Sequence, residues 1–406
     1  MKLLFVVSSL DLKEAFSATP AWWQLLKGLY EIGVDIIATP YQGPAIETLW
    51  WHSEDNPAKW QGDLFKSVRD LGRKFGTSAP VQMQDTQADL TRTEKNLESE
   101  TRMDKFVRQS AQTLIAPIWK RHLDRILTKN PDIDAVIFLT VPLNHLNGVP
   151  AYIQSQHHKP VFYFDGDVPA SLPNMKGFAS GFRIYQGAQL NEYTAFISNS
   201  QGGENLLQQL GVKNTHTLWY GADPDVFSPI PVADKDLDVM FYGHGREYRA
   251  EWIDAMIAQP ARLMPDTKFA VRGTALGDLG PTQLLPYLSF SKLREYACRS
   301  KINLCITRGA HASIYASSSS RPFELSAMGA AIVANPYLGL EEWFEPDKEI
   351  IIINDSAEAI ERYQWLLTHD QEREAIGQRA RQRVLKQHTF QHRARELRQI
   401  IQTYLS

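Results

Sequence analysis

The stretch AHASIYASSSSRPFELSAMGAAI, residues 310–332, has the pattern of a loop that turns into a short helix. Four serines precede Arg321 and Pro322, and an apolar helical pattern continues as far as Gly329. Proline is favoured in the first turn of a helix, where its missing N–H group costs nothing, and glycine is favoured just beyond the last turn. The sequence therefore predicts a helix that begins near Arg321.

The start of this predicted helix combines several groups that bind anions. The first backbone N–H groups of a helix have no partner within the helix, so they are free to donate to a phosphate. The same segment supplies the hydroxyls of Ser318, Ser319 and Ser320 and the guanidinium of Arg321. Glu324 lies near the same end, where its carboxylate could hold sugar hydroxyls. We therefore predict a diphosphate site here; the alternative is a serine-rich loop that caps an ordinary buried helix.

The segments that follow support the first reading. A short buried strand is expected at 331–335, and another turn and helix at 338–342. This order resembles the donor-sugar half of GT-B glycosyltransferases, especially the CgeB-like and related retaining transferases. In that group a helix-start segment binds the donor diphosphate beside a pair of glutamates. The second glutamate corresponds to Glu324, for which the resemblance implies a contact with the nucleotide ribose. Ala316 stands at the position of the first, which lies close to the transferred sugar.

The rest of the chain alternates between strand and helix patterns. An apolar run at 3–8, a helix pattern at 22–30 and a second apolar run at 34–38 predict the start of a parallel doubly wound sheet. Further strands are expected at 135–140, 161–164, 196–198, 237–242, 269–273, 302–307 and 350–353.

The domain organisation follows from length and from one junction. The string GADPDVFSP, residues 221–229, resembles the passage between the two domains of GT-B transferases, and 406 residues exceed one ordinary core. We expect an α/β protein of the GT-B fold: two Rossmann-like doubly wound domains that face each other across a cleft. The N-terminal, acceptor-side domain covers 1–229, with an irregular insertion at about 43–91. The C-terminal, nucleotide-sugar-binding domain covers 230–406.

The C-terminal segment at about 371–406 has a charged helical pattern, and we expect one uninterrupted final helix. In GT-B proteins a terminal helix often crosses back to the first domain, and this segment suits that role. A helix that faces solvent or forms an oligomer is the alternative.

Arginines follow two strand ends of the second domain. A glycine turn at Gly243 and Gly245 leads to Arg246 and Arg249, and Arg272 ends the next expected strand. Glycine lets a ligand approach the backbone, and arginine can neutralise a diphosphate. The resemblance implies that these residues bind the donor and that Arg246 assists departure of the diphosphate. A tight turn with surface arginines is the alternative.

Asp165 and Asp167 follow the strand at 161–164 as an Asp-x-Asp pair, which could hold a divalent metal bridged to a diphosphate. However, aspartates at strand ends often cap turns, and Asp223 and Asp225 repeat the same form. We therefore expect no metal site. We assign Asp167 a catalytic role at the cleft edge of the first domain, where it faces the acceptor or the reacting sugar.

Composition limits the other function classes. A hydrophobic share of 43%, a charged share of 22% and a net charge of −3 are typical of a soluble globular protein, and they give no reason to expect nucleic acid as a partner. Cys298 and Cys305 match no metal framework and suit a reducing compartment, so we expect a cytoplasmic location. Trp50, Trp51 and Trp60 lie in the irregular segment, where they could pack locally, hold an acceptor or touch a membrane surface. At most peripheral membrane contact is expected.

The resemblance implies a glycosyltransferase that moves a sugar from a nucleotide-diphosphate donor, for which UDP is one candidate carrier. It also implies front-face attack with retention; no metal and no other cofactor are expected. The acceptor, whether glycan, protein or small molecule, cannot be read from the sequence. Two alternatives remain open: a sugar-nucleotide 2-epimerase-like enzyme, and a non-catalytic nucleotide-sugar-binding protein, which the alanine at Ala316 makes a serious option.

Overall fold

The first of two parallel sheets is built from the N-terminal half of the chain. The computed structural model describes residues 1–9, 21–58, 105, 108–173, 184–243, 246–273, 276–286 and 290–405. Within these residues the first sheet has the strand order β3-β2-β1-β4-β5-β6-β7. Its strands are β1 (Lys2–Ser9), β2 (Asp35–Gln42), β3 (His52–Ser53), β4 (Ala135–Leu139), β5 (Val161–Asp165), β6 (Ala195–Ser198) and β7 (Thr215–Thr217).

Helices cover both faces of this sheet because its central strands are apolar on both sides. On β4, Val136 and Phe138 face one cluster, which includes residues of α5 (Ala116–Lys129) and α6 (Val149–His157). Ala135 and Ile137 face the other cluster, to which α1 (Ala21–Glu31) contributes Leu25, Leu26 and Leu29. The described residues of this half also form α8 (Gly203–Gln209).

The second sheet repeats the same topology in the C-terminal half. Its strand order is β10-β9-β8-β11-β12-β13 within the described residues, and all of its pairs are parallel. The strands are β8 (Leu237–Tyr242), β9 (Phe269–Arg272), β10 (Gln283–Leu284), β11 (Ser300–Cys305), β12 (Ala331–Ala334) and β13 (Ile351–Ile352). The helices are α9 (Arg246–Ile253), α10 (Gln259–Leu263), α11 (Phe290–Arg299), α12 (Gly309–Ala312), α13 (Ser320–Ala327), α14 (Ser356–Thr368), α15 (Asp370–Gln387) and α16 (Phe390–Gln402).

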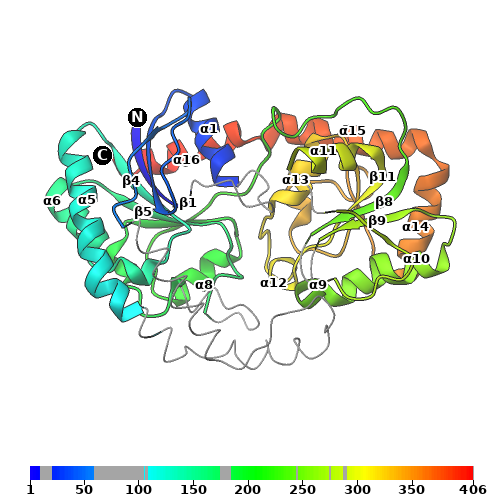
Figure 1. Cartoon of the computed structure of the whole chain (residues 1–406), viewed down its shortest axis with the longest axis horizontal. Helices are drawn as coiled ribbons and strands as arrows, with labels where there is room; N and C mark the ends of the chain where they lie inside the picture. The colour runs from blue at the N-terminus through cyan, green and yellow to red at the C-terminus, as the bar shows by residue number, and fades with distance from the viewer. Residues whose placement is uncertain are drawn as a thin grey trace.

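Both sheets reverse their direction of winding beside their first strand. In the first sheet β1 lies between β2 and β4, and in the second β8 lies between β9 and β11. Open parallel sheets bind ligands outside the carboxyl ends of the strands at such a switch point. Figure 1 shows the two α/β bodies side by side. The predicted GT-B architecture of two doubly wound domains is therefore confirmed.

The expectation of one final helix over 371–406 is wrong. α15 ends at Gln387 and α16 begins at Phe390. Between them Thr389 caps α16, because its side chain accepts a hydrogen bond from the N–H of His392. In return, the ring of His392 accepts a hydrogen bond from the N–H of Thr389. The same turn pairs with the interdomain connection: the N–H groups of Ala222 and Phe390 donate to the carbonyls of His388 and Ala222. The helix is thus interrupted where the chain crosses the junction.

The final helix does cross back to the first domain. Figure 1 shows α16 beside α1, and its residues Phe390, Ala394, Leu397 and Ile401 belong to the same buried cluster as Leu25 and Leu29. The two helices approach closely: a Cβ added at Gly28 would lie 2.7 Å from the carbonyl oxygen of Phe390.

A buried ion pair fixes α1 to the interdomain connection. The Nζ of Lys27 lies 2.8 Å from the carboxylate of Asp223 and 2.6 Å from that of Asp225. Burial alone would lower the pKa of the Lys27 ammonium, but its hydrogen bonds to Asp223, Asp225 and Glu31 raise it above the ordinary value. The second Asp-x-Asp pair of the sequence is therefore used as a structural anchor. The described part of the chain contains no helix long and apolar enough to span a membrane.

Candidate functional site

A polar pocket of about 290 Å³ lies where the two domains meet. The first domain contributes Gly166 and Asp167, which follow β5, and the second contributes Arg308, which follows β11. We call it the polar pocket; its lining residues are Ala21, Gly166, Asp167, Tyr220, Arg308, His311, Ser318, Ser319, Ser320 and Glu324. It therefore brings together Asp167, three predicted serines and Glu324, which come from opposite halves of the chain.

Backbone and side-chain hydrogen bonds between the domains form one wall of this pocket. The N–H and hydroxyl of Ser318 both donate to the carbonyl of Asn199, and the Asn199 amide donates to the carbonyl of Ser318. The hydroxyl of Ser318 also accepts from the N–H of Tyr220. Ser200 and Ser317 share a hydroxyl contact of 2.6 Å beside it. The structure thus places the polar groups of Ser318 in the domain contact.

The start of α13 faces the polar pocket. Ser319 precedes the helix in extended conformation, and its side chain makes no capping hydrogen bond. By contrast, Asp355 at the start of α14 accepts a hydrogen bond from the N–H of Glu358. The helix starts at Ser320, next to Arg321, as the sequence predicts. Its first N–H groups therefore lack the side-chain acceptor that would otherwise occupy them, and they suit an anion.

Arg321 is held by a ring and a carboxylate. Its guanidinium carbon lies 4.3 Å from the ring centre of Tyr242, the last residue of β8, and its Nη1 lies 3.3 Å from Glu324. Arg272 contacts the same ring at 4.8 Å. Burial raises the pKa of the Glu324 carboxyl, while Arg321 and a hydrogen bond from Ser320 oppose that shift. The two arginines that were predicted separately thus meet at one tyrosine.

Asp167 reaches across the junction to the second domain. Its carboxylate accepts a hydrogen bond from Arg308, and the ring of His311 lies 3.5 Å away. Burial raises the pKa of Asp167, although 36% of its side chain is exposed, and Arg308 and Arg249 oppose the shift. Burial, together with Arg308 and Arg249, holds the pKa of His311 well below its ordinary value, so its ring is neutral at neutral pH. This cluster can accept a proton or hydrogen-bond a hydroxyl.

The remaining predicted arginines and glycines are not among the residues that line the polar pocket, or they fall outside the described residues, although Arg249 is close enough to influence Asp167 and His311. The Nε of Arg249 donates to the carbonyl of Ile306 at 2.7 Å. Gly243 packs against its own sheet: a Cβ there would lie 2.5 Å from the Phe241 ring, and its N–H donates to the carbonyl of Arg272. Gly245 and the side chain of Arg246 lie outside the part of the chain that the structure describes, as do Trp60 and residues 59–91 of the expected insertion.

The alanine at the position of the first family glutamate has a structural reason. Ala316 is fully buried with φ +47°, a region that is unfavourable for residues with side chains. Its carbonyl accepts from the Trp219 indole and the Gln201 N–H, and its N–H donates to Leu338. A Cβ added at Gly339 would lie 2.9 Å from that of Ala316. Because Ala316 is fully buried and lies against Gly339, a longer side chain at this position would require the surrounding segments to move.

The aspartate that precedes Asp167 is occupied by local hydrogen bonds. The carboxylate of Asp165 accepts from the hydroxyls of Ser171 and Tyr185 and from the N–H of Asp167. Asp165 is fully buried, and burial raises its pKa. The Asp-x-Asp spacing is therefore explained by a turn that orients Asp167 and leaves Asp165 inside the first domain.

Three pocket residues with polar side chains were missed by the sequence analysis: Tyr220, Arg308 and His311. The sequence could have indicated Arg308, because this residue directly follows the strand predicted at 302–307. It gave no indication of Tyr220 and His311, because their place at the pocket depends on how the two domains meet.

Comparisons with known proteins agree with this architecture. Residues 246–399 match the family model described as glycosyl transferase-like. No curated protein matches the chain. Among solved structures, the chain is similar to sucrose-phosphate synthase from Thermosynechococcus elongatus, at 12% identity and a TM-score of 0.61, with 99% of each chain covered.

Two further solved structures are similar in fold to this chain. HepE from Anabaena, solved in complex with UDP, has 13% identity and a TM-score of 0.59 and covers 99% of this chain and 100% of its own. The β-glucosyltransferase of T4 phage has 11% identity and a TM-score of 0.56, with full coverage of both chains. At such identities the likeness concerns the fold. The predicted resemblance is therefore confirmed: the chain has the fold of GT-B glycosyltransferases, and its residues 246–399 match the glycosyl transferase-like family.

Proposed function

We propose that this chain transfers a sugar from a UDP-linked donor to a hydroxyl group of an acceptor. The observation that carries this proposal is the polar pocket, which joins the uncapped start of α13 and Glu324 to Asp167 of the opposite domain. The glycosyl transferase-like match over 246–399 covers the half that holds α13. HepE, which has the same fold, was solved with UDP, and this supports the choice of carrier.

The donor lies with its diphosphate at the start of α13. The N–H groups of the first turn and the hydroxyls of Ser319 and Ser320 donate to phosphate oxygens, and Arg321 adds a charged contact. Glu324 accepts from the ribose hydroxyls. Charge that develops on the departing diphosphate is stabilised by Arg308, which lies on the path toward Asp167.

Transfer proceeds with retention and without a metal ion. Asp167 and Glu324 are the carboxylates that line the polar pocket within the described residues, and each is already in contact with an arginine. Burial raises the pKa of both carboxyls despite these arginines, so Asp167 can hydrogen-bond the acceptor hydroxyl while the acceptor proton passes to the departing phosphate oxygen. The helix start and the arginines supply the positive charge that a metal would otherwise provide. Asp167 orients the acceptor hydroxyl and the reacting sugar.

Titration with UDP, followed by incubation with a panel of nucleotide sugars, tests the proposal. We expect UDP to bind, and we expect a UDP-sugar to be hydrolysed or transferred in excess chelator with retained anomeric configuration by NMR. Asp167→Asn should lower turnover by roughly 10- to 150-fold, the value of one hydrogen bond to a charged group, while the Kd for UDP stays close to that of the wild type. Failure of every nucleotide to bind the folded protein would refute the proposal, and epimerised product would favour the 2-epimerase alternative. Loss of turnover in chelator that Mn²⁺ or Mg²⁺ restores would refute the metal-free mechanism.

A further inference from the structure

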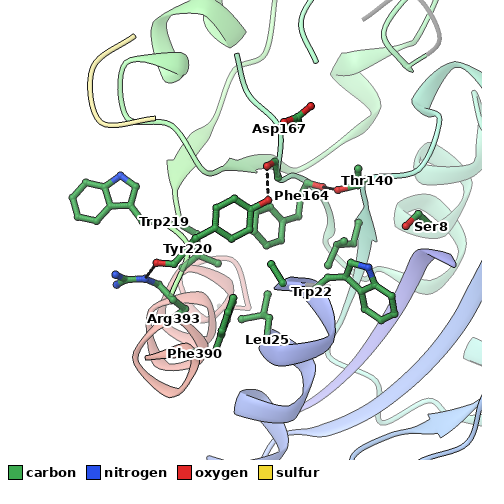
Figure 2. Close-up of a pocket in the computed structure, with 14 residues that line it drawn as sticks. Ser8, Trp22, Leu25, Thr140, Phe164, Asp167, Trp219, Tyr220, Phe390 and Arg393 are labelled. Carbon is green, nitrogen blue, oxygen red and sulfur yellow. Dashed lines mark hydrogen bonds between the residues drawn. The ribbon is translucent and has the colours of Figure 1, made fainter. Parts of the chain in front are cut away.

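A second pocket, of about 310 Å³, lies inside the first domain and adjoins the polar pocket. The two share Ala21, Gly166, Asp167 and Tyr220. We call it the aromatic pocket because five of its lining residues carry aromatic rings; its lining residues are Ser8, Ala21, Trp22, Leu25, Leu139, Thr140, Phe164, Gly166, Asp167, Leu218, Trp219, Tyr220, Phe390 and Arg393, most of them labelled in Figure 2. It has one mainly apolar body and one polar end, at Asp167.

Its position in the fold is that of a ligand site. Ser8 and Thr140 lie at the carboxyl ends of β1 and β4, the two strands between which the first sheet changes its direction of winding. Thr140 has φ +50°, which is strongly unfavourable for a β-branched residue. Such backbone strain is concentrated at functional sites, where the surrounding structure maintains it. The polar pocket lies at the corresponding edge of the second sheet, so each domain presents one pocket to the junction.

The rings that form the walls are fixed in place. The hydroxyl of Tyr220 donates to the carbonyl of Gly166, and its own carbonyl accepts from the Nε of Arg393. Figure 2 shows the Tyr220 ring extending from the Arg393 side toward the segment that carries Asp167. Trp22 of α1 approaches the pocket from another side. The cavity is therefore preformed by the fold, which lowers the entropy that a ligand must lose on binding.

The charges of the aromatic pocket favour a neutral ligand. Arg393 is only 2% exposed, and its guanidinium also contacts Glu396 and His388, so its charge is balanced within the protein. Among the described residues that line the pocket, the remaining charged group is Asp167, which would repel an anion and accept a hydrogen bond from a hydroxyl. A neutral molecule that carries a hydroxyl at the Asp167 end satisfies both conditions.

We infer that the aromatic pocket binds the acceptor, and that the acceptor is a neutral hydroxyl compound with one or two aromatic rings. An apolar cavity of about 150 Å³ holds one benzene ring, so a cavity of about twice that volume fits a fused or linked pair. Rings such as Trp22, Phe164 and Tyr220 bind a flat aromatic group through edge and face contacts that a saturated ring of equal size does not make. This inference rests on the proposed function, because it identifies the acceptor of the same reaction.

The reaction then joins the two pockets. The acceptor oxygen at the Asp167 end forms a bond to the anomeric carbon of the sugar, while the bond from that carbon to the diphosphate oxygen breaks and its electron pair leaves with UDP. The hydroxyl proton passes to the departing phosphate oxygen. The products are an aryl glycoside and UDP.

Calorimetric titration of the full chain with 2-naphthol tests the inference, with decahydro-2-naphthol as the saturated control and 2-naphthoate as the charged control. We expect 2-naphthol to bind more tightly than either, both with and without UDP. Trp22→Ala should weaken 2-naphthol binding by roughly 2- to 13-fold, the value of one aromatic pair. Trp365→Ala, which removes a partly exposed indole on α14 outside both pockets, should leave it unchanged.

Each result has a distinct meaning. Equal affinity for 2-naphthol and its saturated analogue, or tighter binding of the anion, would overturn the aromatic acceptor even if UDP binds. Failure of UDP to bind while 2-naphthol does would refute the proposed function and leave the aromatic pocket standing. If Trp22→Ala does not fold, Ser8→Phe provides a second test, because a ring at the end of β1 should fill the pocket and abolish 2-naphthol binding. Unchanged binding in a folded Ser8→Phe variant would also overturn the inference.

Discussion

Replacement of Arg321 by alanine should separate a donor-binding residue from an ordinary surface arginine. Arg321 follows the first residue of α13, and its guanidinium rests on the Tyr242 ring beside Glu324. The side chain is 21% exposed, so it is ordered by the fold yet remains accessible to solvent. In the proposed complex it adds a charge-assisted contact to the diphosphate, next to the N–H groups of the helix start.

The magnitude follows from that contact. A hydrogen bond to a charged group contributes about 1.5–3 kcal/mol, which corresponds to a roughly 10- to 150-fold increase in the Kd for UDP. The change also removes the contact with Tyr242, which contributes about 0.5–1 kcal/mol at a partly exposed site. We therefore expect a large loss of UDP affinity, together with a loss of stability because the buried Glu324 carboxyl loses its partner.

Isothermal titration with UDP, accompanied by thermal unfolding of each variant, measures both quantities. Arg299→Ala is a matched control in the same domain, because Arg299 also rests on a tyrosine ring, that of Tyr296, and pairs with a carboxylate, that of Asp236. It lies outside both pockets. If Arg321→Ala and Arg299→Ala bind UDP equally well and both are folded, the start of α13 is only a buried helix terminus and the donor site lies elsewhere.

Two further predictions concern stability. Lys27→Met should lower the free energy of unfolding by about 3 kcal/mol, because it leaves the buried carboxylate of Asp223 without its partner. Urea unfolding measures this loss, with the exposed Lys292→Met as a control for which almost no change is expected. A loss below about 1 kcal/mol in Lys27→Met would contradict the prediction. Glu324→Gln tests the effect of burial on a carboxyl whose pKa is raised above its ordinary 4.5. Such a group stabilises the fold fully below its unfolded pKa, and this contribution is lost as pH rises through the folded pKa. The stability of the glutamine variant relative to wild type should therefore increase with pH above 4.5. A pH-independent difference between the two proteins in chemical unfolding would disprove this prediction.

The strands could be predicted from sequence because each is a short apolar run that ends at a polar or glycine turn. The run at 302–307 corresponds to β11, displaced by two residues because the structure begins the strand at Ser300. The break at Thr389 could not be predicted in the same way. Its capping partner His392 is local, but the contact with Ala222 that fixes the turn joins residues far apart in the chain.

The candidate site was predictable in parts. Proline at the third position of α13 and the serines before it indicated the helix start correctly. The use of Ser318 in the contact with Asn199 could not be foreseen, because that contact exists only when the domains meet. For the same reason the pairing of Asp167 with Arg308 escaped the sequence analysis. Residue patterns report local backbone preference, whereas these pairings depend on the relative placement of two separately built sheets.

The return of α16 to α1 has a consequence for synthesis on the ribosome. The core of the first domain includes Phe390, Leu397 and Ile401, so it stays incomplete after all of its strands have emerged. Roughly 170 residues separate β7 from α16, and at about 5–20 residues per second their translation takes on the order of 10–35 s. During that interval α1 exposes the apolar surface that α16 later covers, and exposed surface of this kind is prone to aggregation. The second domain must therefore be made before the first can finish folding.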